Sequence, residues 1–244
     1  MSTQDVLKTL KDENIAYVDI RFTDIRGKLQ HVTVDVDLVD EDFLEEGFMF
    51  DGSSIAGWKS IENSDMKLIV DTDSAYIDPF YAEKTLCVHC SIVEPDTGEA
   101  YERDPRGTAQ KAEAYLKESG IGDVAYMGPE AEFFIFDDVR FENKINKVSY
   151  EVDAVDASWN TDTEYEMGNS GHRPGLKGGY FPVNPIDDAQ DLRSEMLSTM
   201  KSLGMKVDKH HHEVASCQHE LGLIFGTVTK QADEIQKYKY VIHN

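Results

Sequence analysis

Residues 128–137 read GPEAEFFIFD, a short run in which two glutamates precede four apolar residues. Glu130 and Glu132 are two positions apart, so on a β-strand their side chains point to the same face. Residues 133–136 are apolar at every position, which predicts a strand buried on both faces. The run therefore predicts a buried strand that begins with a pair of carboxylates.

Two interpretations of this carboxylate pair are open. Carboxylates that enter a buried strand repel each other and lose their hydration, and a divalent cation between them relieves both costs. Mg²⁺ and Mn²⁺ prefer oxygen ligands, so either ion suits such a pair. The alternative places both glutamates at an exposed strand end as hydrated surface charge, and an isolated pair favours that alternative.

A second acidic group lies in DKHHHEVASCQHELG, residues 208–222. Strands expected at 205–215 and 218–226 form a tight hairpin, in which Glu213 and Glu220 flank the turn and can face each other. A second carboxylate pair is what a two-metal site needs. The histidines at 210–212 alternate between faces, so all three cannot bind one zinc ion, and one or two of them are expected to support the carboxylates.

A third group is the loop FMFDGSSIAGW, residues 48–58. Asp51 and the glycine and serines after it are typical turn residues, and a simple turn accounts for them. Apolar residues precede the loop and Trp58 follows it, so we expect an anchored loop that holds the carboxylate of Asp51 in a fixed place.

The three cysteines do not indicate a disulfide scaffold, because their number is odd and small. Cys87 and Cys90 form a Cys-x-x-Cys pattern that is typical of zinc sites and redox pairs. They lie in an apolar strand pattern, where they face opposite sides, so we expect buried core cysteines there and at Cys217.

Two domains are expected, residues 1–103 and 104–244, because RDPR at 103–106 places Asp104 as a helix N-cap and Pro105 at the first helical position. The first is predicted to be mainly β, with a short helix capped by Ser2 or Thr3. Its other expected elements are strands at 15–23, 29–36, 67–72 and 85–94 and a helix at 37–46 that Gly47 ends. The second is predicted to contain helices at 105–119 and 187–203, the latter capped by Asp187 or Asp188. Strands are predicted at 123–128, 131–138 and 145–153, and a functional loop at 158–186.

The charge of the chain excludes some partners. It carries 47 acidic and 24 basic residues, a formal charge of −23, so bare nucleic acid and anionic membrane are not expected to bind it. No apolar stretch approaches the ~20 residues that span a bilayer, and the first residues do not form a signal peptide. A cytoplasmic protein is the expectation.

Familiar nucleotide and nucleophile motifs are absent. The sequence contains no GxxxxGK[ST], no GxGxxG and no GxSxG. If a nucleotide binds, we expect carboxylate-bound metal ions to hold its phosphates.

Taken together, these groups resemble type I glutamine synthetase over essentially the whole chain. YVDIRFTDIRGKLQHVTV (17–34) resembles the start of the β-grasp domain of that family, and FDGSSIAGWKSIENSDMKL (50–68) resembles its N-terminal signature. RDPR resembles the entry to its catalytic domain, and GPEAEFF and HHEVASCQHE resemble its metal-binding strands. The resemblance implies an α+β fold, with an N-terminal β-grasp domain followed by part of an antiparallel-sheet catalytic domain.

The resemblance also implies a reaction and its residues. ATP phosphorylates L-glutamate, and ammonia displaces phosphate from γ-glutamyl phosphate to give L-glutamine. Asp51 is implied to bind ammonium and draw off its proton in the active site of a neighbouring subunit, Asp208 to lie near ATP, and Tyr180 to lie near the ammonium pocket. The ligands implied for two Mg²⁺ or Mn²⁺ ions are Glu130, Glu132, Glu213 and Glu220. A homo-oligomer follows, in the family a dodecamer of two hexameric rings.

Two alternatives and one departure accompany this resemblance. A related ligase that couples glutamate to an amine or polyamine is one alternative, and the intact loop around Asp51 argues against it. A non-catalytic metal-binding or regulatory module is the other. The departure is that the family continues beyond Asn244 with further metal-, glutamate- and phosphate-binding segments, and the last helical pattern has no closing residue. We therefore expect an N-terminal portion that is inactive alone.

Overall fold

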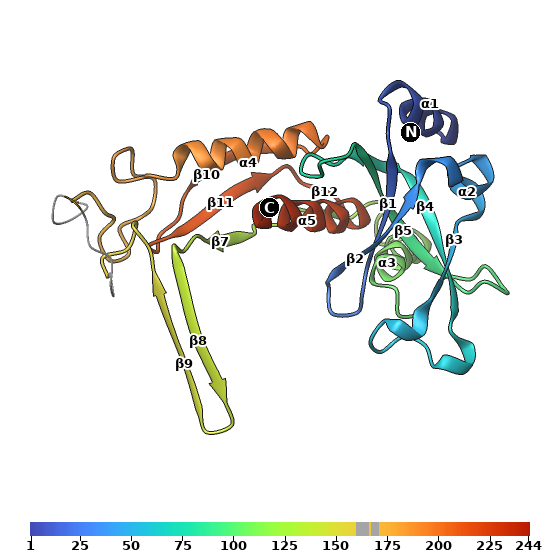
Figure 1. Cartoon of the computed structure of the whole chain (residues 1–244), viewed down its shortest axis with the longest axis horizontal. Helices are drawn as coiled ribbons and strands as arrows, with labels where there is room; N and C mark the ends of the chain where they lie inside the picture. Colours follow the sequence, from blue (N-terminus) through green and yellow to red (C-terminus); the bar gives the residue numbers. More distant parts are fainter. Residues whose placement is uncertain (160–165, 167–170) are drawn as a thin grey trace. The chain divides into compact units, whose positions relative to one another are not determined.

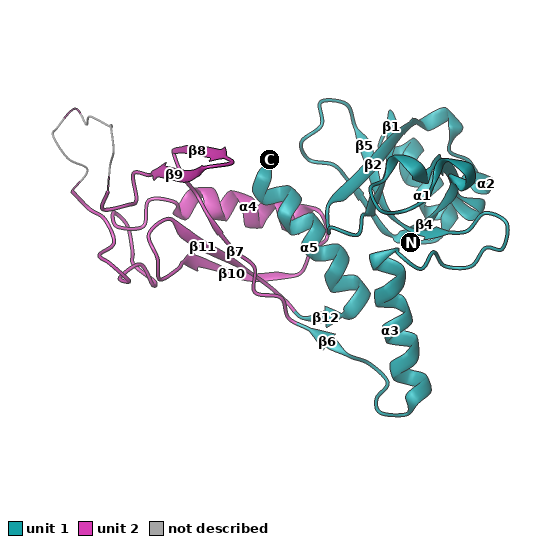
Figure 2. Cartoon of the chain, turned by 90° about the horizontal axis from the view of Figure 1, so that it is seen from below, with its two compact units in different colours: residues 1–127, 225–244 teal, residues 128–224 magenta. Residues whose placement is uncertain are grey.

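The computed structural model describes residues 1–159, 166 and 171–244. The chain divides into two compact units, each described here by itself (Figure 2). Unit 1 contains residues 1–127 and 225–244, and unit 2 contains residues 128–224. The domain boundary expected between residues 103 and 104 falls inside unit 1 and stays a prediction. Among the described residues, no helix is both long and apolar enough to cross a membrane.

Unit 1 is built on a mixed five-stranded sheet (Figure 1). Its strand order is β2 (Leu29–Asp35), β1 (Tyr17–Thr23), β5 (Thr85–Val93), β4 (Asp65–Ile77) and β3 (Phe48–Asp51). The central pair β1 and β5 is parallel and the other pairs are antiparallel. Six consecutive residues of β5, 85–90, are buried, because both faces of this central strand are covered.

One face of this sheet packs into an apolar core beneath two N-terminal helices, α1 (Thr3–Asp12) and α2 (Glu41–Glu46). Ser2 caps α1, one of the two caps that the sequence predicted, and it forms a capping box with Asp5. Helix α2 ends at Gly47, whose φ of 88° favours glycine, and a Cβ at this position would lie 2.2 Å from the carbonyl oxygen of Leu68. The close approach explains why a glycine stops this helix against the sheet.

The opposite face of the sheet carries a buried polar layer. Arg21 donates to Asp19 at 2.7 Å, to Asp78 at 2.8 Å and to the hydroxyl of Tyr76 at 2.6 Å. Its guanidinium also lies 4.3 Å from the ring centroid of Tyr240. Carboxylate, hydroxyl and aromatic partners therefore surround this cation, which is almost fully buried.

Two helices bring their own charges to this layer, α3 (Pro105–Ser119) and α5 (Val228–His243). Arg106 of α3 donates to Asp233 of α5 at 3.0 Å and to the Ser91 hydroxyl of β5 at 2.8 Å, and it pairs with Asp71 of β4. Short strands β6 (Tyr126–Met127) and β12 (Gly226–Thr227) pair beside these helices. Helices far apart in the sequence thus meet through ion pairs on one sheet face.

The pH dependence of unit 1 is expected to depend on His89, which lies in this layer. Burial, with the nearby charges of Lys237 and Arg106, lowers the pKa of His89 to about 3. The unfolded chain takes up a proton near the ordinary pKa of about 6.5, so the unfolded state binds more protons below that pH and stability falls. His89 alone is expected to remove about 2 kcal/mol of unfolding free energy between pH 7 and 5.

Urea unfolding of the wild type and His89→Gln at both pH values measures this contribution. The stability deficit of His89→Gln is expected to shrink by about 2 kcal/mol from pH 7 to pH 5, because glutamine does not titrate. An equal deficit at both pH values would contradict the assignment.

Unit 2 contains an antiparallel three-stranded sheet in the order β10 (Val207–His212), β11 (Gln218–Leu223) and β7 (Glu132–Phe134). Helix α4 (Gln190–Ser202) packs on β10. Strands β8 (Asp138–Lys144) and β9 (Lys147–Asp153) form a separate hairpin (Figure 1). The α+β class expected from the sequence is confirmed by these elements.

Two local predictions for unit 2 are wrong. The strand after Glu132 is not buried on both faces, because β7 lies at the sheet edge and Phe134 is 51% exposed. Neither Asp187 nor Asp188 is the N-cap of α4, which begins after Ala189 without a side-chain cap. Asp187 instead binds the buried guanidinium of Arg193, a partner that the local pattern did not reveal. Residues 160–165 and 167–170 of the expected functional loop lie outside the described residues.

All three cysteines are free and buried, as predicted.

Candidate metal centre

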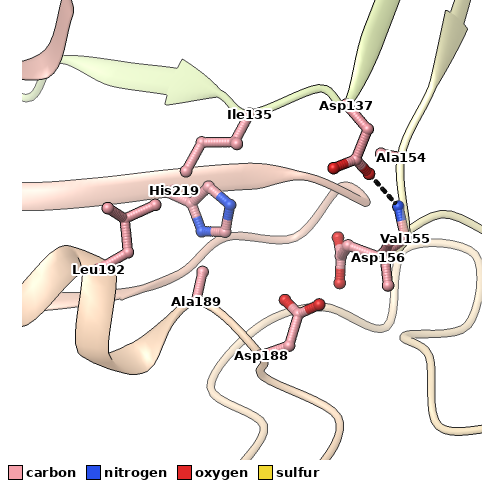
Figure 3. Close-up of a pocket in the computed structure, with 9 residues that line it drawn as sticks. All are labelled: Ile135, Asp137, Ala154, Val155, Asp156, Asp188, Ala189, Leu192 and His219. Atoms are coloured by element: carbon pink, nitrogen blue, oxygen red, sulfur yellow. Dashed lines mark hydrogen bonds between the residues drawn. The ribbon is translucent and has the colours of Figure 1, made fainter. Parts of the chain in front are cut away.

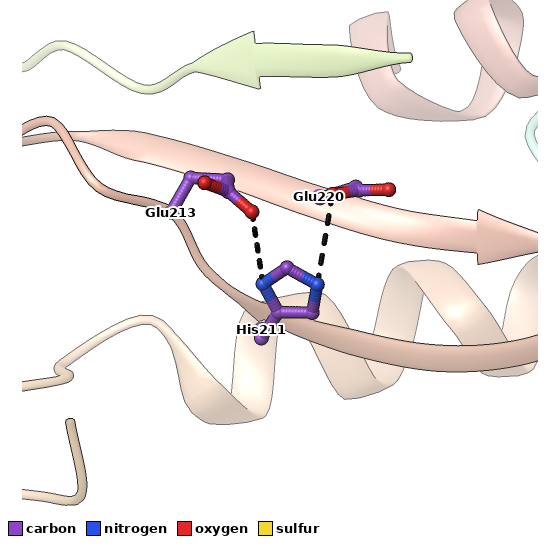
Figure 4. A group of neighbouring side chains, drawn as sticks. All are labelled: His211, Glu213 and Glu220. Carbon is purple, nitrogen blue, oxygen red and sulfur yellow. Dashed lines mark ion pairs between the residues drawn. The ribbon is translucent and has the colours of Figure 1, made fainter. Parts of the chain in front are cut away.

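Three side chains gather where hairpin β10–β11 turns, from His211, Glu213 and Glu220 (Figure 4). One possible ligand atom from each lies within 4.8 Å of the other two. The imidazole of His211 lies between the two carboxylates, with Nδ1 3.4 Å from Glu213 Oε1 and Nε2 3.6 Å from Glu220 Oε2. The three groups are therefore close enough for their ligand atoms to share one ion.

Strand register explains this gathering. His211 pairs with Glu220, and Glu220 pairs with Glu132 on β7. Side chains at directly opposed positions lie on the same face of a sheet, so the three strands each contribute one group to that face. Glu132 also accepts a hydrogen bond from the side chain of Gln218. Glu130 precedes β7 by two residues, and its charge acts on Glu220.

The electrostatics of this face favour a bound cation. Burial raises the pKa of Glu220, and the nearby carboxylates of Glu213 and Glu130 raise it further, although His211 opposes them. A divalent ion would remove both the desolvation cost and the repulsion. The two carboxylates are the oxygen donors that Mg²⁺ and Mn²⁺ prefer, whereas an imidazole such as that of His211 is a donor more typical of transition metals. The residues therefore fit a metal ion of the predicted kind.

Asp208 lies on the same face, farther from the turn. The register of β10 and β11 shifts between Val207 and His210, which places Asp208 and Lys209 opposite Gly222. A Cβ on Gly222 would lie 2.1 Å from Asp208 Oδ1, so only glycine leaves room for this carboxylate. The bulge thus aims Asp208 over the strand that carries Glu220.

Tyr180 contacts the centre through His211. Its ring lies edge-on to the imidazole, with 5.6 Å between centroids, and stacks on Phe181 at 3.9 Å. The preceding Gly179 donates its N–H to the carbonyl of Val214 at 3.1 Å, and a Cβ there would lie 2.4 Å from the carbonyl oxygen of Glu213. A close backbone approach therefore places Tyr180, 54% exposed, beside the metal-ligand candidates.

Asp51 lies in unit 1, at the end of β3. Its Oδ1 accepts from the N–H of Ser53 at 2.8 Å and from the Ser53 hydroxyl at 2.6 Å. The Ser53 hydroxyl and N–H together lower the pKa of Asp51, so its exposed carboxylate stays ionised at neutral pH. Trp58 anchors the loop, with its ring 6.2 Å from Phe50 and 5.6 Å from Tyr101 between centroids.

Sequence reasoning missed part of this site. His211 was not singled out from its two neighbours, although strand alternation places it on the same face as Glu213. On the other face of the hairpin, His212 pairs with Asp156 at 3.1 Å and His219 with Arg193 at 3.1 Å. Asp156 is 56 residues from His212 along the chain, so no local signal indicates that contact.

Comparison with known proteins shows the family of this chain. The family model "Glutamine synthetase, catalytic domain" matches residues 102–244, and "Glutamine synthetase, beta-Grasp domain" matches residues 14–95. A protein named Glutamine synthetase from Cereibacter sphaeroides is 78% identical over 240 residues, which cover 98% of this chain and 51% of that protein. One of the same name from Rhodobacter capsulatus is 74% identical, over 100% of this chain and 55% of that protein.

A solved structure is similar over the same range. The cryo-EM structure of Plasmodium falciparum glutamine synthetase has a TM-score of 0.86 and 25% identity, and the match covers 99% of this chain and 48% of that one. The chain thus spans about half the length of the curated relatives it matches. These matches confirm the predicted fold, a β-grasp domain followed by part of a catalytic domain.

Proposed function

The chain belongs to the glutamine synthetase family, and from this premise we propose that it supplies the N-terminal half of an ATP-dependent glutamate–ammonia ligase. The observation that carries the proposal is the convergence of His211, Glu213 and Glu220 on one face of the hairpin, with Glu132 in register beside them. A phosphoryl-transfer enzyme without a phosphate-binding loop needs such a cluster to hold the ions that accompany ATP.

The metal ligands in this proposal are Glu130, Glu132, Glu213 and Glu220. Bound Mg²⁺ or Mn²⁺ would neutralise the phosphate oxygens of ATP. Glu132 and Glu220 would hold the ions from paired strands, Glu130 and Glu213 from just outside them, and Asp208 lies on the same face, toward the nucleotide in this proposal. The γ-carboxylate of glutamate attacks the γ-phosphorus of ATP, which releases ADP and forms γ-glutamyl phosphate.

Ammonium is the second substrate, and Asp51 and Tyr180 are proposed to receive it. The ionised carboxylate of Asp51 attracts the cation and then accepts one of its protons, which turns ammonium into a nucleophile. Ammonia attacks the acyl carbon and phosphate leaves, which gives glutamine. Asp51 is proposed to act in a neighbouring subunit, so the proposed enzyme is a homo-oligomer, a dodecamer of two hexameric rings. Its proposed location is the cytoplasm.

The test measures glutamine formation by the complete protein from glutamate, ATP and ammonium, with methylamine and putrescine as competing substrates. Asp51→Ala is expected to raise the KM for ammonium about 10- to 100-fold, the size of one charge-assisted hydrogen bond. The KM for ATP is expected to stay within about twofold. Glu45→Ala, which removes an exposed carboxylate from α2, is the matched control.

Three outcomes would overturn this proposal. Preferred use of methylamine or putrescine would favour an amine or polyamine ligase instead. Equal effects of Asp51→Ala on ammonium and ATP would remove Asp51 from the ammonium site. A complete protein that binds metal but makes no glutamine would favour a non-catalytic module.

A further inference from the structure

Asp156, which lies outside the hairpin, binds the turn at residues 213–218. Its Oδ2 accepts a hydrogen bond from the backbone N–H of Cys217 and a second from Nε2 of His212 at 3.1 Å. The other ring nitrogen of His212 donates to the carbonyl oxygen of Glu213 at 2.6 Å. One carboxylate oxygen thus binds both the tip of the turn and the strand that leads into it.

The contact with Asp156 holds Cys217 in an unfavourable backbone conformation. Its φ is 65°, a left-handed conformation that costs a residue with a Cβ roughly 1–2 kcal/mol. Its carbonyl accepts from the N–H of Ile135 at 3.0 Å, and its side chain is fully buried with Ala154 and Ala157. The N–H of this strained residue has Asp156 as its partner, so loss of that partner is expected to release the turn.

The turn that Asp156 holds determines where two candidate metal ligands lie. Glu213 begins it and donates its N–H to the carbonyl of Gln218 at 2.7 Å. The side-chain amide of Gln218 accepts from the N–H of Ala215 at 3.0 Å and donates to the carboxylate of Glu132. A shift of this turn therefore moves Glu213 directly and Glu132 through Gln218.

We infer that Asp156 is a positioning residue of the metal centre, which holds the 213–218 turn from the opposite face of the hairpin without contacting the ion. The inference rests on the proposed function, because it needs Glu132, Glu213 and Glu220 to be metal ligands. Hydrogen-bonded groups behind metal ligands commonly change metal affinity by 10- to 100-fold when they are removed.

The surroundings of Asp156 supply the controls. It is only 8% exposed, and among the described residues its Oδ1 has no hydrogen-bond partner. Asp156 lines a cavity of about 230 Å³ together with Asp137 and Asp188 (Figure 3). Asp188 is exposed and has no bond to the turn, so it carries the same charge beside Asp156 without the same contacts.

The test is Mn²⁺ affinity of the complete protein, measured from the electron paramagnetic resonance signal of free Mn²⁺. Asp156→Ala is expected to weaken binding about 10- to 100-fold. Asp156→Asn is expected to weaken binding less than Asp156→Ala does, because its amide oxygen can still accept the hydrogen bond from the N–H of Cys217. Asp188→Ala, which removes the same charge beside the turn, is expected to bind as the wild type does.

A fourth variant keeps the test decisive if Asp156→Ala does not fold. Asp156→Glu keeps the charge but moves the oxygens by one methylene, which the cavity can accommodate. Positioning predicts tighter Mn²⁺ binding by Asp156→Asn than by Asp156→Glu, whereas a purely electrostatic role predicts the reverse order and would overturn the inference. Wild-type affinity in Asp156→Ala would also overturn it.

Failure of the inference and failure of the proposed function are distinguishable. If the wild type does not bind Mn²⁺, or Glu213→Ala binds it equally well, the metal centre itself is refuted. If Glu213→Ala loses binding while Asp156→Ala keeps it, only the positioning role of Asp156 is refuted.

Discussion

Glu213→Ala is expected to weaken Mn²⁺ binding by the complete protein at least about 100-fold, equivalent to about 3 kcal/mol, and to abolish glutamine formation. The reason is the arrangement of the hairpin, in which Glu213 and Glu220 lie on either side of His211. Removal of one carboxylate leaves the remaining groups unable to surround an ion. Isothermal titration with Mn²⁺ and an activity assay measure the two effects.

The stability of the metal-free protein separates a ligand from a structural residue. The carboxylate of Glu213 contributes to the raised pKa of Glu220, so its removal relieves repulsion in the absence of metal. We therefore expect metal-free Glu213→Ala to lose no more than about 1 kcal/mol of unfolding free energy, since one backbone hydrogen bond from Val214 is lost. Glu195→Ala, an exposed glutamate of α4, is the matched control. A large loss of stability with unchanged metal affinity would contradict the assignment.

Arg21→Ala is expected to lower the unfolding free energy by about 3–5 kcal/mol. The substitution leaves the carboxylates of Asp19 and Asp78 buried without their cation, and it removes a guanidinium that also lies over Tyr240. Urea unfolding followed by circular dichroism measures the loss. Arg26→Ala, at an exposed position in the turn after β1, is expected to stay within about 0.5 kcal/mol.

A further variant tests the cause of that loss. Replacement of Arg21, Asp19 and Asp78 together by apolar residues of similar volume is expected to recover much of the stability, because the cost lies in the unpaired charges. If Arg21→Ala lowers the unfolding free energy by less than about 1 kcal/mol, water reaches the two carboxylates and the polar layer around Arg21 is not buried.

The local patterns predicted those parts of the fold that depend on neighbours in sequence. The tight hairpin around Glu213 and Glu220, a helix cap at Ser2 and the helix stop at Gly47 follow from strand alternation and capping rules, and the structure contains them. The apolar run after Glu132 led to the wrong prediction of a strand buried on both faces. Residue type does not tell whether a strand lies at the edge of a sheet.

The patterns failed where a partner comes from far along the chain. Asp19 and Arg21 alternate with apolar residues in β1 and look like a solvent-facing row, yet both are buried. Their cover includes Tyr240 of α5, about 220 residues later, and no feature of β1 indicates it. The same holds for Asp156, whose contacts with His212 and Cys217 join a loop to a distant turn.

Unit 1 contains residues 1–127 and 225–244, two segments far apart in the sequence, and this has a consequence for its synthesis. All five strands of its sheet leave the ribosome before α5, which follows β5 by more than 130 residues. At typical translation rates that interval lasts roughly ten seconds. During this time Arg21, Asp19 and Asp71 face water without α5. A nascent sheet with a charged rather than an apolar uncovered face is protected from premature association, so the ionic layer suits a domain that is completed late.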